Sequence, residues 1–302
     1  MNTTNKEMKN VFVAGSGLMG SGIAQTAAKA GYEVTLYDIA PEALDRARDN
    51  IVSGLNKRIQ KGKMTEEERD GLMSRLTFSG DIKRASEADL VIEAVYENEN
   101  VKKALISHIA DFVQDNAIIT SNTSSISITE LSRQCKHPEK FMGTHFFAPV
   151  PAMKLLELVK TPVTSRETIE AVKAFGESIG KLCIVSKDRP AFIVNRMLDP
   201  MINEAISLVE SGTGSIEDID LGMRYGLNHP MGPLELIDMS GLDIELAVME
   251  VLYRETGDPK YRPCQLLRDM VRLNWLGRKT GKGFYIYHED GTRTPNHALE
   301  NY

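Results

Sequence analysis

The amino-acid sequence predicts a doubly wound α/β domain that carries a helical-arm insertion and is followed by an all-α C-terminal domain. In the first part of the chain, short apolar runs alternate with amphipathic helical stretches, the pattern of βαβ units in a parallel sheet. A glycine-rich turn joins the first apolar run to the first helical stretch. Beyond Asp188 and Pro190 the strand pattern stops and long helical patterns follow. Because 302 residues exceed one ordinary domain, we expect two, residues 1–187 and residues 188–302.

Short apolar runs give the predicted strands of the first domain. They are residues 10–14, 33–38, 89–95, 117–122, 141–147, 155–161 and 182–186. Helical stretches separate most of these runs, for example residues 18–30 and 167–179. The order of strands and helices indicates a parallel sheet with helices on both faces.

Residues 41–76 interrupt this alternation and are predicted to form the helical arm, two long helices joined around residues 61–63. Lys57, Arg58, Lys61 and Lys63 lie close together in it, on a chain whose net charge is −6. One interpretation of this cluster is a solvated helix face. The other is a surface that collects a polyanion, such as the phosphates of coenzyme A. The pattern alone leaves both open.

Four helical stretches are predicted in the second domain: residues 192–209, 215–225, 234–253 and 265–274. Ser215 followed by Asp218 is typical of the first turn of a helix. The first and third stretches supply more apolar surface than a helical domain of this size covers alone. We therefore expect this domain to form a homodimer.

Composition excludes several classes of function. The net charge of −6 disfavours broad nucleic-acid binding, because a phosphate backbone requires a basic surface. No window reaches the roughly 20 apolar residues of a membrane span. Residues 1–10 are polar and lack the apolar stretch of a signal peptide. The chain has an odd number of cysteines, and they are widely spaced: Cys135, Cys183 and Cys264. This pattern suggests neither a disulfide framework nor a zinc site, so we expect a reducing, cytoplasmic location.

The glycine-rich turn has the spacing of a dinucleotide-binding fingerprint, because it follows an apolar run and opens a helix. Such a turn brings backbone N–H groups and the positive end of a helix to a pyrophosphate. Asp38 ends the next strand about 20 residues later, where a carboxylate holds the ribose hydroxyls and repels a 2′-phosphate. The pattern predicts a Rossmann-type domain that binds NAD in preference to NADP; a plain glycine turn beside an exposed Asp is the alternative. The residues expected to contact the cofactor here are Gly15, Gly17, Leu18, Met19, Gly20 and Asp38.

Glu93 lies inside the apolar run of residues 90–95, where an unpaired carboxylate would be costly. We expect it at the end of its strand, facing the cofactor cleft.

Polar motifs are predicted beyond the carboxyl ends of the strands, where open α/β sheets bind ligands. They are residues 121–125, 144–147 and 155–158. His145 and Glu157 are the residues suited to oxidation of a secondary alcohol, which needs a base for the hydroxyl proton. A carboxylate paired with the imidazole would fix its tautomer. A core histidine with structural partners is the alternative. The histidine spacings do not support a zinc site.

Eight motifs together resemble the 3-hydroxyacyl-CoA dehydrogenases, in order and over almost the whole chain. They are residues 15–20, 91–94, 121–125, 145–147, 153–155, 192–196, 229–233 and 281–285. Within the family, residues 261–263 and 275–279 are most similar to bacterial 3-hydroxybutyryl-CoA dehydrogenases. The resemblance implies NAD-dependent oxidation of short-chain L-3-hydroxyacyl-CoA to 3-oxoacyl-CoA, and the reverse reduction of acetoacetyl-CoA, in fatty acid or butanoate metabolism.

Carried over by position, the resemblance implies that His145 is the general base and Glu157 its partner. It implies that Ser124 and Asn195 position the substrate oxygen and the cofactor, whereas their residue types alone suggest a turn serine and a helix-capping asparagine. The other implied NAD contacts are Glu93, Lys102, Ser124 and Lys279. The expected coenzyme A contacts are Lys57, Lys61, Lys102 and Ser124.

Two positions depart from the family pattern. Ala148 stands where the family usually has Asn, which puts one cofactor contact in doubt, and Ala191 stands where it usually has Gly. Ala191 also argues against the β-hydroxyacid dehydrogenases that use a lysine four residues before the second-domain asparagine. A relative acting on a free sugar acid, or an idle NAD-binding protein on the same scaffold, are the remaining alternatives.

Overall fold

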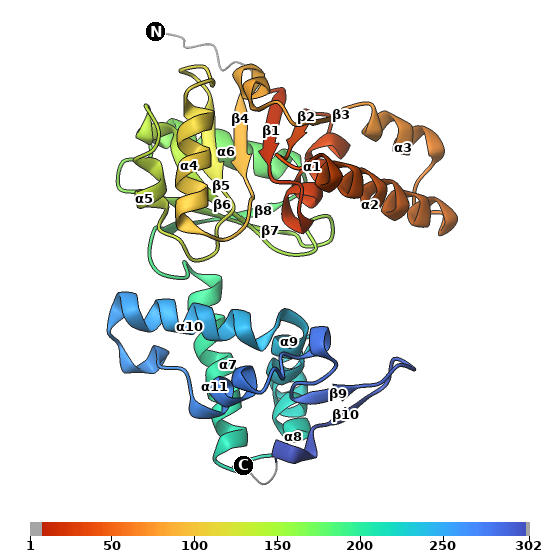
Figure 1. The fold of residues 1–302 in the computed structure, drawn as a ribbon, viewed down its shortest axis with the longest axis vertical. Helices are drawn as coiled ribbons and strands as arrows, with labels where there is room; N and C mark the ends of the chain where they lie inside the picture. Colours follow the sequence, from red (N-terminus) through yellow and green to blue (C-terminus); the bar gives the residue numbers. More distant parts are fainter. Residues whose placement is uncertain (1–7, 300–302) are drawn as a thin grey trace. The chain divides into compact units, whose positions relative to one another are not determined.

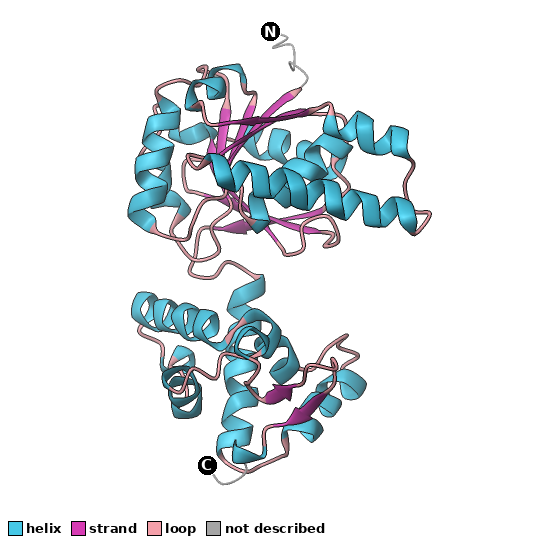
Figure 2. Ribbon diagram, turned by 45° about the vertical axis from the view of Figure 1, so that its right-hand side comes forward, coloured by secondary structure: helices cyan, strands magenta, loops and turns pink. Residues whose placement is uncertain are grey.

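The computed structural model describes residues 8–299, which divide between Arg189 and Pro190 into two compact units (Figure 1). The first unit is built around one sheet with helices on both of its sides (Figure 2). The second unit is mainly helical. The predicted fold class is therefore confirmed.

Within the described residues the first unit has one eight-stranded sheet, in the order β3-β2-β1-β4-β5-β6-β7-β8. The strands are β1 (Asn10–Ala14), β2 (Glu33–Tyr37), β3 (Leu76–Ser79), β4 (Leu90–Glu93), β5 (Ile118–Ser121), β6 (Phe141–Phe146), β7 (Leu155–Lys160) and β8 (Leu182–Lys187). The helices are α1 (Leu18–Lys29), α2 (Pro41–Gln60), α3 (Glu66–Met73), α4 (Glu99–Ala110), α5 (Ile128–Ser132) and α6 (Arg166–Ser178), with short 3₁₀ turns at Ile82–Glu87 and Pro138–Lys140.

The sheet core explains the continuous apolar runs of the sequence. Val11 and Val13 of β1 and Leu156 of β7 are buried with residues of α1 and α6 in one hydrophobic cluster. Strands covered on both faces need apolar side chains at successive positions rather than at alternate ones. Ala27 and Ala28 of α1 are fully buried in this cluster, and their small side chains allow the helix to lie close to the sheet.

Two expectations for this sheet were wrong. The predicted parallel order fails at one place, because β7 runs antiparallel to β6. The segment 147–154 between them is too short for the crossover of a dozen or more residues that parallel neighbours require. In addition, β3 was missed: it has four residues, two of them polar, and lies at the edge of the sheet after the arm. The arm itself consists of α2 and α3.

The second unit contains α7 (Val194–Glu210), α8 (Ile216–Leu221), a π-helical turn (Gly222–Gly226), α9 (Pro233–Ser240), α10 (Leu242–Thr256) and α11 (Gln265–Arg272), with 3₁₀ turns at Pro259–Tyr261, Arg278–Thr280 and His297–Leu299. The single helix predicted over residues 234–253 is two, because Gly241 has φ of 111° between α9 and α10. Ser215 caps α8 by accepting a hydrogen bond from the N–H of Asp218.

The expectation that strands end with the first domain was also wrong. β9 (Tyr285–Tyr287) and β10 (Arg293–Pro295) form an antiparallel hairpin in the second unit. Buried Asp238 of α9 anchors it, because its carboxylate accepts hydrogen bonds from the N–H groups of Phe284 and Tyr285. Three-residue strands are too short to produce a visible alternation in the sequence. None of the helices described between residues 8 and 299 has the length and apolar character needed to cross a bilayer.

Candidate active site

The glycine turn between β1 and α1 is built as the dinucleotide fingerprint requires. Gly15 has φ of 107°, and a Cβ there would lie 2.6 Å from the carbonyl oxygen of Ala94. A Cβ on Gly20 would lie 1.7 Å from the carbonyl oxygen of Gly15, so helix and turn could not pack with any larger residue. Gly17, in contrast, has open space around it. Close approach to the turn is therefore possible at Gly17, where a pyrophosphate would lie.

The first turn of α1 is suited to an anion. Its N-cap, Gly17, has no side chain to cap the helix, and the first turn, which contains Leu18 and Met19, has no acidic residue. The N–H groups and the positive end of the helix dipole are left to attract a negatively charged ligand. Leu18 is 76% exposed, so this part of the turn is accessible.

Asp38 lies directly after β2 and is bonded to the same turn. Its Oδ2 accepts hydrogen bonds from the N–H and the hydroxyl of Ser16, at 2.9 and 2.7 Å, and its Oδ1 accepts one from the N–H of Ala40. The glycine turn and the carboxylate expected at the ribose thus form one connected structure. The residues present fit a nicotinamide dinucleotide.

His145 and Glu157 lie side by side in the sheet. They are directly opposite one another in the antiparallel pair β6 and β7, and Nδ1 of His145 is 3.1 Å from Oε2 of Glu157. Glu157 is fully buried and His145 is 6% exposed, with its ring against that of Phe147. The placement of Glu157 beyond the carboxyl end of a parallel strand was wrong; it lies near the amino end of an antiparallel one. This reversal is what brings it to His145.

Glu93 lies at the end of β4, as expected, and its side chain is fully buried. Its Oε1 accepts hydrogen bonds from Lys102 Nζ at 2.7 Å and from the N–H of Val95, and its Oε2 accepts one from the hydroxyl of Ser121. Lys102 is 1% exposed. In this structure the two residues form an internal ion pair at the end of the sheet.

Glu97, which sequence reasoning missed, connects this ion pair to the loop after β5. Its Oε2 is 3.2 Å from Lys102 Nζ. Its Oε1 accepts hydrogen bonds from the N–H of Ser124 at 3.1 Å and from the hydroxyls of Thr123 and Ser125. One carboxylate thereby fixes the loop that carries Ser124, whose own side chain is half-buried. A glutamate five residues before a motif lysine is too weak a signal to identify from the sequence.

A second contact ties that loop to the strand of His145. Oδ1 of Asn122 accepts a hydrogen bond from the N–H of Phe146 at 2.9 Å. Ser124 and His145 therefore belong to neighbouring segments that are bonded together where β5 and β6 end. The glycine turn follows β1 at the same end of the sheet, with β4 between β1 and β5.

Three lysines of the arm are exposed to solvent, whereas Arg58 is half-buried and its Nε is shielded from water. Lys57 near the end of α2 and Lys61 and Lys63 in the following turn are exposed. A hollow of about 390 Å³ lies beside Lys57, and Ser53 and Asn56 also line it.

The remaining candidates belong to the second unit. Asn195 is half-buried in the first turn of α7, whose N-cap is Ile193, so Asn195 is not the capping residue. Lys279 lies in a 3₁₀ turn, with its Nζ 2.5 Å from Oδ1 of Asp243. Among residues 8–299, no three His, Cys, Asp or Glu side chains gather as metal ligands would.

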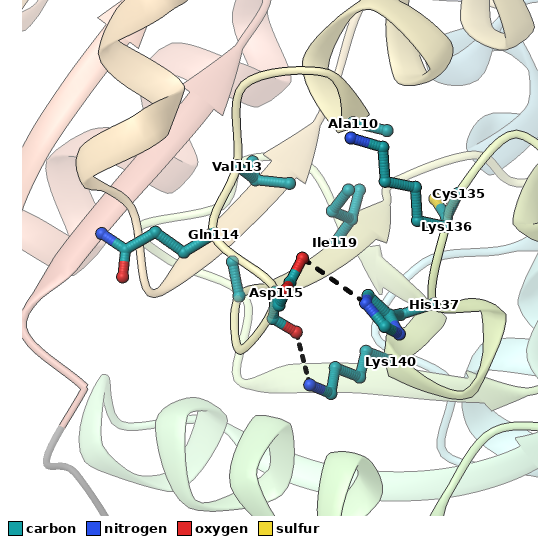
Figure 3. Close-up of a pocket in the computed structure, with 10 residues that line it drawn as sticks. Ala110, Val113, Gln114, Asp115, Ile119, Cys135, Lys136, His137 and Lys140 are labelled. Carbon is teal, nitrogen blue, oxygen red and sulfur yellow. Dashed lines mark hydrogen bonds and ion pairs between the residues drawn. The ribbon is translucent and has the colours of Figure 1, made fainter.

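A small pocket elsewhere in the first unit is not this site. It holds about 20 Å³, enough for a water molecule, and lies between the end of α4 and the segment before β6 (Figure 3). Asp115 contacts His137 and Lys140 there. Ala117 and Lys140 precede β5 and β6, so the pocket is at the amino ends of these strands, opposite to Ser124 and His145. Burial raises the pKa of Cys135, which lines it, to about 12, which favours the protonated thiol over the nucleophilic thiolate.

Comparison with known proteins identifies the family. The model for the NAD binding domain of 3-hydroxyacyl-CoA dehydrogenase matches residues 10–189, and the model for its C-terminal domain matches residues 192–287. A probable 3-hydroxybutyryl-CoA dehydrogenase of Bacillus subtilis is 46% identical over 283 residues, which cover 94% of this chain and 99% of the relative. The mitochondrial hydroxyacyl-coenzyme A dehydrogenase of Sus scrofa is 40% identical over 288 residues, 93% of this chain and 91% of the relative.

A solved structure gives the same result. The (S)-3-hydroxybutyryl-CoA dehydrogenase of Ralstonia eutropha superposes with a TM-score of 0.91 at 46% identity, covering 93% of this chain and 100% of that one. The chain belongs to the 3-hydroxyacyl-CoA dehydrogenase family of oxidoreductases, with the family's NAD-binding domain followed by its C-terminal domain.

Proposed function

We propose that this enzyme oxidises short-chain L-3-hydroxyacyl-CoA, typified by 3-hydroxybutanoyl-CoA, to 3-oxoacyl-CoA, and reduces acetoacetyl-CoA in the reverse direction. The observation that carries the proposal is the His145–Glu157 contact. It lies at the end of the sheet where β1 leads into the glycine turn. The names of the relatives, which include several 3-hydroxybutyryl-CoA dehydrogenases, support the substrate class.

In this proposal His145 accepts the proton of the substrate's 3-hydroxyl group. Glu157 accepts a hydrogen bond from Nδ1–H, so Nε2 is the atom that transfers the proton. The carboxylate also stabilises the imidazolium that forms. Because Glu157 is fully buried, its charge acts on the imidazole with little screening by water. When bound, NAD supplies the hydride acceptor. In the reductive direction His145 returns the proton to the 3-oxo oxygen.

Ser124 and Asn195 are proposed to position the substrate oxygen and the nicotinamide by donating hydrogen bonds. The Glu97 contact with the N–H of Ser124 supports a fixed position for this serine. Glu93 and Lys102 support the same edge of the sheet from inside, and Lys279 is a proposed contact of the cofactor.

NAD is the proposed cofactor in preference to NADP. The NAD-binding family model supports NAD, and the carboxylate of Asp38 would lie against the ribose hydroxyls. A 2′-phosphate there would meet a negative charge already bonded to Ser16.

The exposed lysines of the arm are the proposed contacts for the phosphates of coenzyme A. Lys57 and Lys61 project from one end of α2, and Ser124 in the loop after β5 is a further proposed contact. Lys102, which was expected to contact coenzyme A, is 1% exposed and paired with Glu93 instead. A compact run of positive charge on an acidic protein suits a polyanionic handle.

We further propose a homodimer formed through the second unit. Met197 of α7 and Ile244 and Tyr253 of α10 are among its exposed apolar side chains. Such apolar surface favours association between copies. The three free cysteines agree with a reducing compartment, and we propose the cytoplasm. The proposed reaction would serve fatty acid or butanoate metabolism.

Oxidation of NADH tests the reaction directly. Acetoacetyl-CoA should be reduced with a kcat/KM far above that for free acetoacetate, and longer 3-oxoacyl-CoA esters should be poorer substrates. Preferential reduction of the free acid would contradict the CoA ester assignment, and activity with NADPH alone would contradict the cofactor assignment.

A further inference from the structure

Two carboxyl groups that the proposed reaction does not use are buried together in the second unit. Asp199 of α7 and Glu245 of α10 are each 4% exposed, and the two helices pack against each other. Among residues 8–299, neither Oδ2 of Asp199 nor Oε1 of Glu245 has a hydrogen-bond partner. A buried carboxylate oxygen without a donor is costly, and the charge of Asp199 acting on Glu245 adds to that cost.

The charged groups on the helices around this pair are engaged elsewhere. They pair as follows: Asp220 of α8 with the N–H of Leu234, Asp238 of α9 with the N–H of Phe284, Glu235 of α9 with Arg293, Asp243 of α10 with Lys279, Glu250 of α10 with Arg268 of α11, Asp269 of α11 with Arg272, and Lys260 of the following 3₁₀ turn with Asp258. Arg196 of α7 lies over the ring of Tyr261 and interacts with Asp258. No cation among the described residues is placed to neutralise Asp199 and Glu245.

A proton is the remaining way for the protein to neutralise them. Burial raises the pKa of Asp199 to about 7. Burial, together with the charge of Asp199, raises the pKa of Glu245 well above its ordinary value. When two neighbouring carboxyls cannot both ionise, the pair keeps one proton.

We propose that Asp199 and Glu245 share a proton at neutral pH, and that its loss at higher pH weakens the packing of α7 against α10. The contact between α7 and α10 would then depend on pH. The first turn of α7 contains Asn195, which lies one helical turn before Asp199.

The direction in which stability changes with pH follows from proton binding. In the unfolded chain both carboxyls ionise near pH 4, whereas the folded protein retains a proton to higher pH. The folded state therefore binds more protons, and its stability falls as pH rises through the folded-state pKa values. The loss begins above about pH 4 and continues past neutrality.

The proton itself can be observed. Infrared difference spectra between the full-length protein and its Asp199→Asn/Glu245→Gln variant, recorded near neutral pH, should contain the carbonyl stretch of one protonated carboxylic acid. Glu204→Gln is the matched control, because Glu204 is an exposed carboxylate on α7. The difference spectrum of this control should contain the carboxylate bands of Glu204 and no band of a protonated carboxylic acid. Absence of the protonated-acid band from the first spectrum would overturn the proposal.

Thermal unfolding supplies an independent measurement. Near pH 9 the double variant should melt at least about 3 °C above the parent protein, with the gap closing near pH 5, whereas Glu204→Gln should show no such trend. If the double variant does not fold, Glu245→Gln alone retains a donor for Asp199 and should show a smaller gap of the same sign. A gap independent of pH would overturn the proposal. A second outcome would also overturn it: the melting temperature of the parent protein near pH 9 rises when K⁺ replaces choline at equal ionic strength. That result would mean that a bound cation neutralises the pair.

Discussion

His145 and Glu157 face each other across an antiparallel strand pair, and their 3.1 Å contact is set by the register of β6 and β7. Side chains directly opposite in such a pair point to the same face of the sheet. The orientation of the imidazole thus depends on backbone pairing in the core and not on a mobile loop. Any substitution that preserves the strands but alters the carboxylate tests the role of the pair.

Glu157→Gln should lower kcat about a hundredfold while leaving the KM for NADH within about twofold, because the amide keeps the shape but removes the charge that stabilises the imidazolium. Steady-state kinetics with acetoacetyl-CoA measure both values. Glu177→Gln, an exposed carboxylate on α6, is the control and should be silent. Equal loss in the two variants would show that charge at position 157 is irrelevant to turnover.

Asp38→Asn should reduce the preference for NADH over NADPH by at least about tenfold. The amide oxygen can still accept the hydrogen bonds from Ser16, while the negative charge that repels a 2′-phosphate is gone. The ratio of kcat/KM for the two cofactors measures the effect. Glu42→Gln, an exposed residue in the first turn of α2, makes the same charge change outside the site. An unchanged ratio in Asp38→Asn would remove this residue from cofactor selection.

Glu97→Gln should lower kcat with acetoacetyl-CoA by about tenfold, since one charged acceptor holds the N–H of Ser124 and the hydroxyls of Thr123 and Ser125. The melting temperature should change little, because Glu97 is partly exposed. Glu99→Gln, two residues further and paired with Lys103 at the surface, should behave like the parent enzyme. Normal turnover in Glu97→Gln would mean that the loop holds its position without this carboxylate.

Replacing Lys57, Lys61 and Lys63 by Ala should raise the KM for acetoacetyl-CoA several-fold, reduce its dependence on salt and leave the KM for NADH unchanged. All three are exposed, so the fold should tolerate the change. Lys83, Lys136 and Lys173 replaced together are a control with the same charge change outside the arm. Equal effects on both substrates would indicate a general loss of structure instead of a lost coenzyme A contact.

Local patterns made much of this fold predictable. The turn at Gly15 to Gly20 was identifiable because its chemistry lies within one short segment. β1 was identifiable because burial on both faces leaves a continuous apolar run, and β2 because buried and less buried positions alternate along it. Asp38 followed from its fixed distance to that turn. The pairing of His145 with Glu157 could be suggested from the need of a buried carboxylate for a partner, but its geometry could not.

The features that escaped prediction depend on contacts distant in sequence or on very short elements. The direction of β7 was readable only from the shortness of segment 147–154. The break at Gly241 lies in an apolar pattern that continues on both sides of it. The role of Glu97 arises from its meeting with a loop about 27 residues away, for which no periodicity exists.

The central claim is that His145 transfers the proton in this reaction. The most direct measurement compares the turnover of acetoacetyl-CoA by the parent enzyme and by His145→Gln. NADH binding to both proteins is titrated by fluorescence. The variant should bind NADH as tightly as the parent enzyme and reduce acetoacetyl-CoA at least about a hundredfold more slowly, because general acid–base catalysis supplies on the order of 10²–10⁴ in rate. Near-normal turnover by a variant that binds NADH normally would contradict the account.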